Sequence, residues 1–328
     1  MHSNICTAGG AAIQTAPFSG GKMIRLNAQR VFYEWNPKNQ PVVSVQPGEI
    51  LVVETNDCFS ETLTEKDGWN ITSGEVDVSL LNPITGPIWV EGAEPGDILA
   101  ITIEKIQFKP YAVIANRKNC GILGEQFERT TYKYMRIEKD QIWFDDRLSV
   151  PVRPMVGVIG VTPVEPISTR KMGDWGGNMD NSRIGEGATL YLPVQLEGAL
   201  FGIGDLHACM GDGEMNGSAM EAGGYVTLKA SLIKESSLKR PAILDETHFY
   251  TTATARDVMT AIKYACEDML DILACQTGKA REELAMLMSG VGDMQICVAC
   301  SPETQTVRFA MPRKILEFYA GEFKPFPE

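Results

Sequence analysis

Short apolar segments separated by turns fill the first 250 residues of this 328-residue chain, and no apolar repeat of 3.6 residues persists among them. Pro47-Gly48-Glu49 is a typical turn, and beyond a second turn Leu99, Ile101 and Ile103 alternate with other residues, as in a strand that buries one face. Strands are predicted at residues 42–45, 50–55, 98–106, 155–161, 189–194 and 225–234. This pattern favours a β-sandwich or β-barrel and argues against a doubly wound parallel sheet.

The C-terminal part of the sequence adds helices to this β-rich pattern. A helix is predicted from about Ala255 to Thr277, with Thr254 as N-cap, Asp257 at the third helical position and Gly278 as the stop signal. A second helix near 281–288 and strands near 294–299 and 307–311 should follow. We therefore expect a mainly β protein with an α+β C-terminal part and a β-sandwich/barrel-like N-terminal half.

Changes in composition suggest three segments. Residues 1–22 are small and polar and are predicted to form a flexible arm. Residues 23–150 would form a β-rich N-terminal domain with an excursion at 111–146, where Arg117-Lys118 and other charges suggest a solvated face. Residues 151–328 would form a β-rich, then α+β, C-terminal domain that carries most of the functional site.

The net charge and the hydropathy of the sequence limit the cellular locations and binding partners that can be expected. The net charge of −12 and the pI near 4.9 disfavour binding to nucleic acid or to anionic membranes. No apolar stretch approaches the roughly 18 residues of a membrane span, and residues 1–21 lack the basic charge of a secretory signal. A cytoplasmic location is expected. The eight cysteines show no disulfide framework, and Cys297 and Cys300 are interpreted as plain thiols, because no second pair or nearby histidine completes a zinc knuckle.

The densest group of chemically active side chains lies between Gly204 and Glu214. Asp205 and His207 are two residues apart, as are Asp212 and Glu214, so each pair shares a face on an extended chain. Imidazole and carboxylates can hold a divalent metal or carry out general acid–base chemistry on water. The alternative is an acidic turn beside a hydrogen-bonded histidine. Because the chain has only three histidines, a metal site would depend on carboxylates.

Three further features are candidates with simpler explanations. The turn Gly176–Asp180 carries Asn178 and Asp180, although loops commonly contain such residues. Asp57 follows a predicted strand and is also a typical turn residue. Cys209, beside His207, suggests thiol catalysis, but catalytic pairs are usually assembled from distant segments.

These polar segments, in this order, resemble the acetamidase/formamidase family. The resemblance lies in Asn82–Pro87, Val90–Asp97, Gly176–Asp180, Gly187–Val194, Gly198–Glu221 and Arg281–Asp293, and it covers roughly residues 40–106 and 150–316. It implies hydrolysis of small linear amides to a carboxylate and ammonia, a β-rich fold, homo-oligomers (dimers or larger) and a bound divalent metal. Zinc is the expected ion, with calcium or another left open.

The positions that match the family, together with Trp175, are the candidate site residues, and their side chains suggest their roles. The expected catalytic residues are Glu214, His207, Asp212 and Asn178. The expected substrate-binding residues are Trp175, Glu221 and Asp180. The expected metal ligands are His207, Asp57, Asp205 and Glu214.

One position departs from the pattern of the family. Trp175 stands where relatives commonly have a histidine, and an indole can neither bind a metal nor carry a proton. Trp175 would therefore line the pocket of an active enzyme, or it would mark a diverged, non-hydrolytic small-molecule-binding protein with the same fold.

Overall fold

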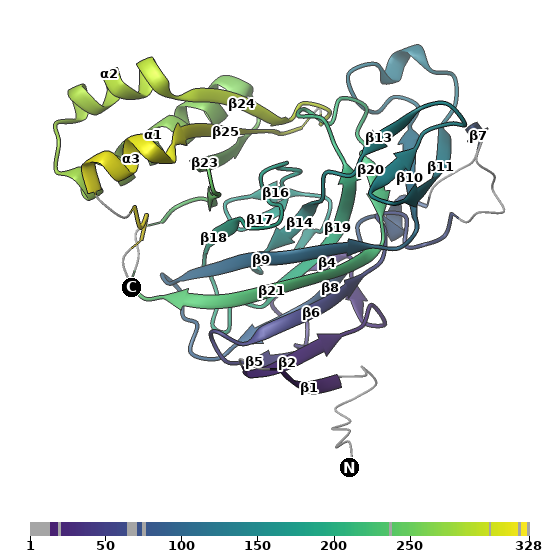
Figure 1. The fold of residues 1–328 in the computed structure, drawn as a ribbon, viewed down its shortest axis with the longest axis horizontal. Coiled ribbons are helices and arrows are strands. Elements are labelled where there is room, and N and C mark those ends of the chain that lie inside the picture. Colours follow the sequence, from purple (N-terminus) through teal and green to yellow (C-terminus); the bar gives the residue numbers. More distant parts are fainter. Residues whose placement is uncertain are drawn as a thin grey trace.

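Two large β-sheets and three C-terminal helices make up the computed structural model of the chain (Figure 1). The structure describes residues 14–18, 21–63, 71–73, 77–235, 238–301, 303–320 and 323–326. Of the segment predicted as a flexible arm (1–22), residues 14–18 form a strand and 21–22 begin the next one, and the remainder lies outside the described residues.

The first sheet has ten strands. Their order across the sheet is β1 (Gln14–Phe18), β2 (Gly21–Leu26), β6 (Ile50–Thr55), β21 (Gly224–Ile233), β9 (Ile98–Phe108), β18 (Thr189–Pro193), β22 (Ala242–Leu244), β23 (His248–Ala255), β25 (Gln305–Pro312) and β24 (Asp293–Val298). All neighbours pair antiparallel except β2 and β6.

The second sheet has thirteen strands and carries most of the polar segments noted in the sequence. Its main path is β13 (Ser149–Pro151), β12 (Gln141–Trp143), β11 (Thr131–Glu138), β10 (Tyr111–Asn116), β20 (Met220–Ala222), β19 (Phe201–Cys209), β14 (Met155–Gly160), β17 (Gly176–Asn178) and β16 (Met172–Gly173). Strands β3 (Val31–Phe32), β5 (Val43–Val45), β7 (Ile71–Ser73) and β8 (Ile84–Val90) join it from the side, and β4 (Glu34–Trp35) pairs separately with β15 (Ile167–Ser168).

Both sheets combine strands from before and after residue 150. In the first sheet β9 lies between β21 and β18, and in the second β10 pairs with β20 through Val113 and Glu221. The segment 111–146 is therefore an integral part of the second sheet, as β10, β11 and β12. Residue 150 marks no boundary between the sheets.

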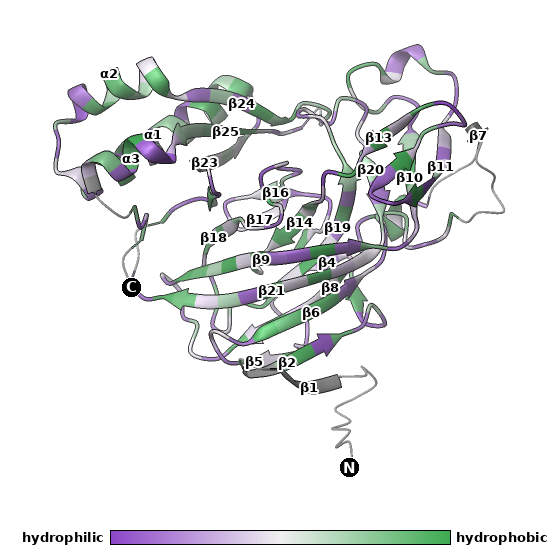
Figure 2. Ribbon diagram, viewed as in Figure 1, coloured by the Kyte–Doolittle hydropathy of each residue, from purple (hydrophilic) through white to green (hydrophobic). Residues whose placement is uncertain are grey.

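Two apolar cores explain the layering. One lies between the sheets and includes Leu51, Ile101 and Phe201. The other lies between the C-terminal strands and the helices α1 (Val258–Thr277), α2 (Arg281–Val291) and α3 (Arg313–Ala320). In Figure 2 these helices alternate between hydrophobic and hydrophilic residues, as expected where one helical face is buried.

The longest helix begins three residues later than predicted. Asp257 is its N-cap, with a side chain that accepts a hydrogen bond from the Thr260 amide at 2.9 Å, and Thr254 remains in β23. Gly278 ends the helix at a φ of +64°, as predicted. The predicted fold class, mainly β with helices in the C-terminal part, is confirmed. None of the helices in the described ranges has the length and apolar character that a membrane span requires.

Candidate functional site

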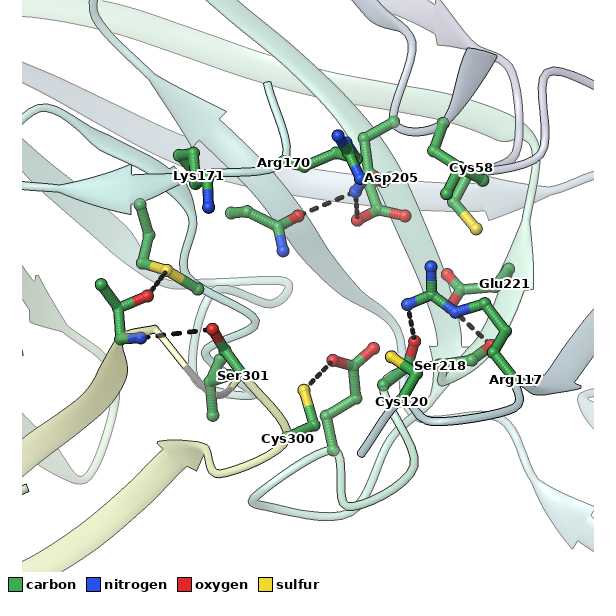
Figure 3. A pocket seen from close by; sticks show the side chains of 18 of the residues that line it. Cys58, Arg117, Cys120, Arg170, Lys171, Asp205, Ser218, Glu221, Cys300 and Ser301 are labelled. Carbon is green, nitrogen blue, oxygen red and sulfur yellow. Dashed lines mark hydrogen bonds between the residues drawn. The ribbon is translucent and has the colours of Figure 1, made fainter. Parts of the chain in front are cut away.

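A cavity of about 230 Å³ lies where the second sheet meets the β24–β25 hairpin (Figure 3). Its walls come from segments that are distant in the sequence. They include the turn after β6, the residues before β8, the end of β10, strands β16, β17, β19 and β20, and the hairpin. The residues with ionisable or nucleophilic side chains in its lining are Cys58, Arg117, Cys120, Arg170, Lys171, Asp205, Glu214, Ser218, Glu221, Cys300, Ser301, Glu303 and Thr304.

A buried group of three carboxylates and one imidazole lies beside this cavity: Asp205 and Glu221 are part of the cavity lining, and Asp180 and His207 are not. His207 on β19 pairs across the sheet with Glu221 on β20, and Asp205 is on the same strand two residues earlier. Asp180 follows β17. The Nε2 atom of His207 is 3.0 Å from Glu221 Oε2, 3.5 Å from Asp205 Oδ1 and 3.8 Å from Asp180 Oδ1. All four residues are at most 3% exposed.

Each of the three carboxylates has one anchored oxygen and one oxygen without a hydrogen-bond partner. Glu221 Oε1 accepts hydrogen bonds from the Ala219 amide at 2.8 Å and the Ser218 hydroxyl at 3.1 Å. Asp205 Oδ2 accepts a hydrogen bond from the side-chain amide of Asn82 at 2.6 Å. The second oxygens, Glu221 Oε2 and Asp205 Oδ1, are buried without a partner and face the imidazole.

Asp180 completes this arrangement through Asn178. The Asn178 side-chain amide donates to Asp180 Oδ2 at 3.0 Å, and its carbonyl oxygen accepts from Asn82 at 2.8 Å. Asp180 Oδ1 and both ring nitrogens of His207 are also buried without a hydrogen-bond partner. Unpaired buried polar atoms are rare in folded proteins. Oxygen and imidazole nitrogen atoms that converge in this way match the donors that a divalent cation uses.

The backbone of the site is conformationally unusual. Asp180, Asp205 and Glu214 adopt positive φ angles of 42°, 54° and 42°, which non-glycine residues rarely do. Such conformations persist only where the surrounding structure enforces them, and they are concentrated at functional sites. Gly157 on β14 makes room for the group, because a Cβ atom there would lie 2.7 Å from Asp180 Oδ1 and 2.8 Å from His207 Cε1.

Burial is the largest influence on the protonation of this group. It raises the pKa of Asp205 to about 6 and that of Asp180 well above its usual value, with neighbouring carboxylates acting in the same direction. Burial lowers the pKa of His207, but the charges of Glu221 and Asp205 outweigh it and hold this pKa well above its ordinary value. Burial also opposes ionisation of Glu221, yet His207 keeps the pKa of Glu221 low. The negative charge therefore exceeds what one imidazolium can balance.

Glu214 approaches the same group from the loop after β19. One of its carboxylate oxygens, a nitrogen of His207 and an oxygen of Glu221 lie within 4.8 Å of one another. The thiol of Cys300 donates a hydrogen bond to Glu214 Oε2 at 3.4 Å from the β24–β25 hairpin. Burial raises the pKa of Glu214 to about 7, although the charge of His207 opposes this shift.

Two of the predicted site residues lie apart from this group. Asp212 is paired with the fully buried Arg308 and accepts a hydrogen bond from Ser182 at 2.7 Å, so it fastens the loop to β25. Asp57 Oδ1 accepts the amides of Phe59 and Glu61 at 2.9 Å each, and its Oδ2 accepts the Tyr111 hydroxyl at 3.0 Å. Asp57 therefore stabilises the turn that carries Cys58 and is not itself in the group around His207.

Trp175 and Cys209 also lie away from the cavity wall. The Trp175 ring covers Gly173 and Gly177 and packs against the core between the sheets. Cys209 lies in a separate apolar cluster, and both Nε and Nη2 of Arg153 donate to its sulfur at 3.3 Å. The position of Cys209 therefore gives no support to thiol catalysis in this cavity.

Several residues of the site were not predicted as such. Asn82 was noted only as part of a motif, and it links Asn178 and Asp205. Arg117, interpreted as part of a solvated face, lines the cavity and donates to the Gly217 carbonyl at 2.8 Å. Cys300, interpreted as a plain thiol, contacts Glu214. Spacing in the sequence gave no signal for Cys58.

The sequence of this chain is similar to those of known proteins. The sequence profile of the acetamidase/formamidase family matches residues 20–173 and 166–318. The chain belongs to this family. It is 26% identical over 268 residues to a formamidase of Methylophilus methylotrophus, a match that covers 64% of this chain and 66%, about two thirds, of the relative.

Solved structures agree with this family membership. A predicted acetamidase/formamidase of Thermoanaerobacter tengcongensis superposes with a TM-score of 0.87 at 39% identity, over 91% of this chain and 98% of the other. An acetamidase of Bacillus halodurans gives a TM-score of 0.86 at 38% identity, over 90% and 99% of the two chains. The resemblance found in the sequence motifs is therefore confirmed, and the predicted enzyme class agrees with these relatives.

Proposed function

We propose that this member of the acetamidase/formamidase family hydrolyses small linear amides to a carboxylate and ammonia with the help of a divalent cation. The observation that carries the proposal is the set of partnerless oxygens on Asp180, Asp205 and Glu221 around the Nε2 atom of His207. The names of the relatives, formamidase and acetamidase, indicate the type of reaction.

The residues around His207 fit a divalent cation. Asp180, Asp205 and His207 place one donor atom each within 4.8 Å of one another. The side-chain amides of Asn82 and Asn178 donate hydrogen bonds to the other carboxylate oxygens of Asp205 and Asp180, respectively. A bound cation would polarise the amide carbonyl and lower the pKa of water. Zinc suits the combination of imidazole and carboxylates, and calcium or another ion remains an alternative.

Glu214 is the group best placed to move protons. It lines the cavity, and its pKa of about 7 lets it take a proton from water and then pass it to the departing nitrogen near neutral pH. Ser218 and Ala219 orient Glu221, and Asn178 orients Asp180. In this proposal Asn178 and Glu221 position the site, and Asp212, which pairs with Arg308, takes no part in catalysis.

The size of the cavity favours small substrates. Its volume of about 230 Å³ is below the 300–1,000 Å³ typical of sites for drug-sized ligands. An acyl group of a few carbon atoms and an attacking water fit this space, because a water occupies about 30 Å³. Since Trp175 packs into the core, its indole gives no reason to regard the cavity as inactivated.

Ammonia release from a panel of short linear amides tests the proposal. Wild-type protein should release ammonia, and Asp205→Asn, which is nearly isosteric, should lose metal and most activity. A protein that binds these amides but releases no ammonia from any of them would instead be the non-hydrolytic binding protein.

We also propose a cytoplasmic, homo-oligomeric protein, a dimer or larger. The seven cysteines of the described part of the chain are all free, as in a reducing compartment. Phe318 and Met286 are 83% and 74% exposed on α3 and α2, which offers apolar surface for association. Light scattering coupled to size-exclusion chromatography measures the state directly, and a monomer at micromolar concentration would contradict the oligomer.

A further inference from the structure

The donor atoms at the cavity form more than one possible cation site. Asp180, Asp205 and His207 form one set, and Cys58, Asp205 and Glu221 form another, each with its donor atoms within 4.8 Å of one another. Asp205 is common to both. Figure 3 shows the side chains of Cys58, Asp205 and Glu221 turned toward the same part of the cavity.

The charge of the group exceeds what one cation balances. Asp180, Asp205, Glu214 and Glu221 bring four carboxylates close together around one imidazole. One divalent cation neutralises two of them, and leaving buried carboxylates unbalanced is costly. A second divalent cation bound through Cys58 adds two positive charges and, through the thiolate that it creates, one negative charge, so the group keeps one uncompensated negative charge instead of two.

Cys58 is held rigidly at its position. The Asp57 carboxylate fixes the turn by accepting hydrogen bonds from the backbone amides of Phe59 and Glu61. The backbone carbonyl of Cys58 accepts a hydrogen bond from the backbone amide of Asn82 at 2.9 Å. The side chain of the same Asn82 holds Asp205. One short network thus sets the sulfur and the shared carboxylate relative to each other.

We propose that the cavity binds two divalent cations side by side, the first through Asp180, Asp205 and His207 and the second through Cys58, Asp205 and Glu221. Asp205 bridges the two ions, and Glu214 stays free to carry protons. Binding at the second site replaces the thiol proton of Cys58, which passes to solvent. A sulfur ligand selects a borderline ion such as zinc and disfavours magnesium and calcium there.

This inference rests on the proposed function for the use of the site, but its test does not depend on turnover. Metal-free protein is titrated with cobalt(II), and bound metal per chain and the thiolate-to-cobalt absorption are measured for wild type, Cys58→Ala and Cys120→Ser. Cys120 is the matched control, because it lines the same cavity but belongs to neither donor set.

We expect two cobalt ions per wild-type chain and per Cys120→Ser chain, with thiolate absorption in both. Cys58→Ala should bind one ion and lose this absorption. One ion per wild-type chain, or an absorption that survives in Cys58→Ala, would overturn the inference. If Cys58→Ala does not fold, the wild-type titration decides, because saturation without thiolate absorption is sufficient to refute it.

The same preparations separate this inference from the proposed function. Two ions with thiolate absorption but no ammonia from any amide would support the two-cation site and refute amide hydrolysis. Ammonia release with one ion and no thiolate absorption would refute the two-cation site and leave the hydrolytic function standing.

Discussion

Gly157 on β14 lies between the residues that pair with Gly204 and Leu206, so a side chain there meets the candidate site directly. A methyl group would place carbon 2.7 Å from Asp180 Oδ1, 2.8 Å from the Asp205 carbonyl and 2.8 Å from His207 Cε1. Ordinary contacts of this kind need about 3.5 Å. Gly157→Ala must therefore displace at least one of these groups by about 0.7 Å.

The expected cost has two parts. Overpacking of a buried site destabilises the fold by about 1–3 kcal/mol. Misplacement of catalytic groups by around 1 Å lowers activity by about 10²-fold. We therefore expect kcat/KM for amide hydrolysis to fall by about 10²-fold, with less metal bound. Gly157 does not have a positive φ, so the effect is due to steric conflict at the site.

Gly290→Ala is the matched control. Gly290 lies in helix α2, and a Cβ atom there meets nothing within 4 Å. This change should leave activity unaltered and should raise stability by about 0.5–1 kcal/mol, because alanine favours a helix. Ammonia release, metal content and thermal unfolding are measured on both variants. Gly157→Ala with activity and metal content within a few-fold of wild type would refute the packing argument.

Three further changes test single residues. Glu214→Gln should retain fold and metal but slow turnover by about 10²-fold, as measured by ammonia release; a few-fold change would remove Glu214 from proton transfer. Cys209→Ala should keep activity within a few-fold, because Cys209 lies in a separate apolar cluster, and an inactive variant would restore the thiol mechanism. Asp57→Asn tests whether protonation of Asp57 is coupled to folding. Burial raises the pKa of Asp57 from 3.8 to about 6, so the protonated carboxyl stabilises the folded state, and this stabilisation is lost as pH rises from about 4 to 6. The free energy of unfolding in urea should fall by up to about 3 kcal/mol more for wild type than for Asp57→Asn across this pH range. Equal changes with pH in the two proteins would contradict the raised pKa of Asp57.

The sequence predicted the strands well because local signals define them. Turn residues such as Pro47-Gly48 bracket β6, and the alternation of Leu99, Ile101 and Ile103 lies within β9. The start of α1 was misplaced, because Asp257 and Thr254 are both good N-caps and pairing with β25 keeps Thr254 in β23. The ordered polar motifs identified the family correctly.

The site was only partly predictable, because long-range contacts assemble it. Asp205 and His207 share a face of β19, as their spacing indicated. The same argument failed for Asp212, since the loop turns its carboxylate to Arg308, which is distant in sequence. Cys58 and Asn82 reach the cavity through tertiary contacts that spacing cannot reveal.

Removal and return of the cation show whether amide hydrolysis by this protein needs a divalent metal. The protein is stripped of metal with a chelator, metal content is confirmed, and ammonia release from a short linear amide is followed before and after zinc is added back. We expect the metal-free protein to be inactive and its activity to return in proportion to the zinc bound. Full ammonia release by verified metal-free protein would show that the reaction needs no cation.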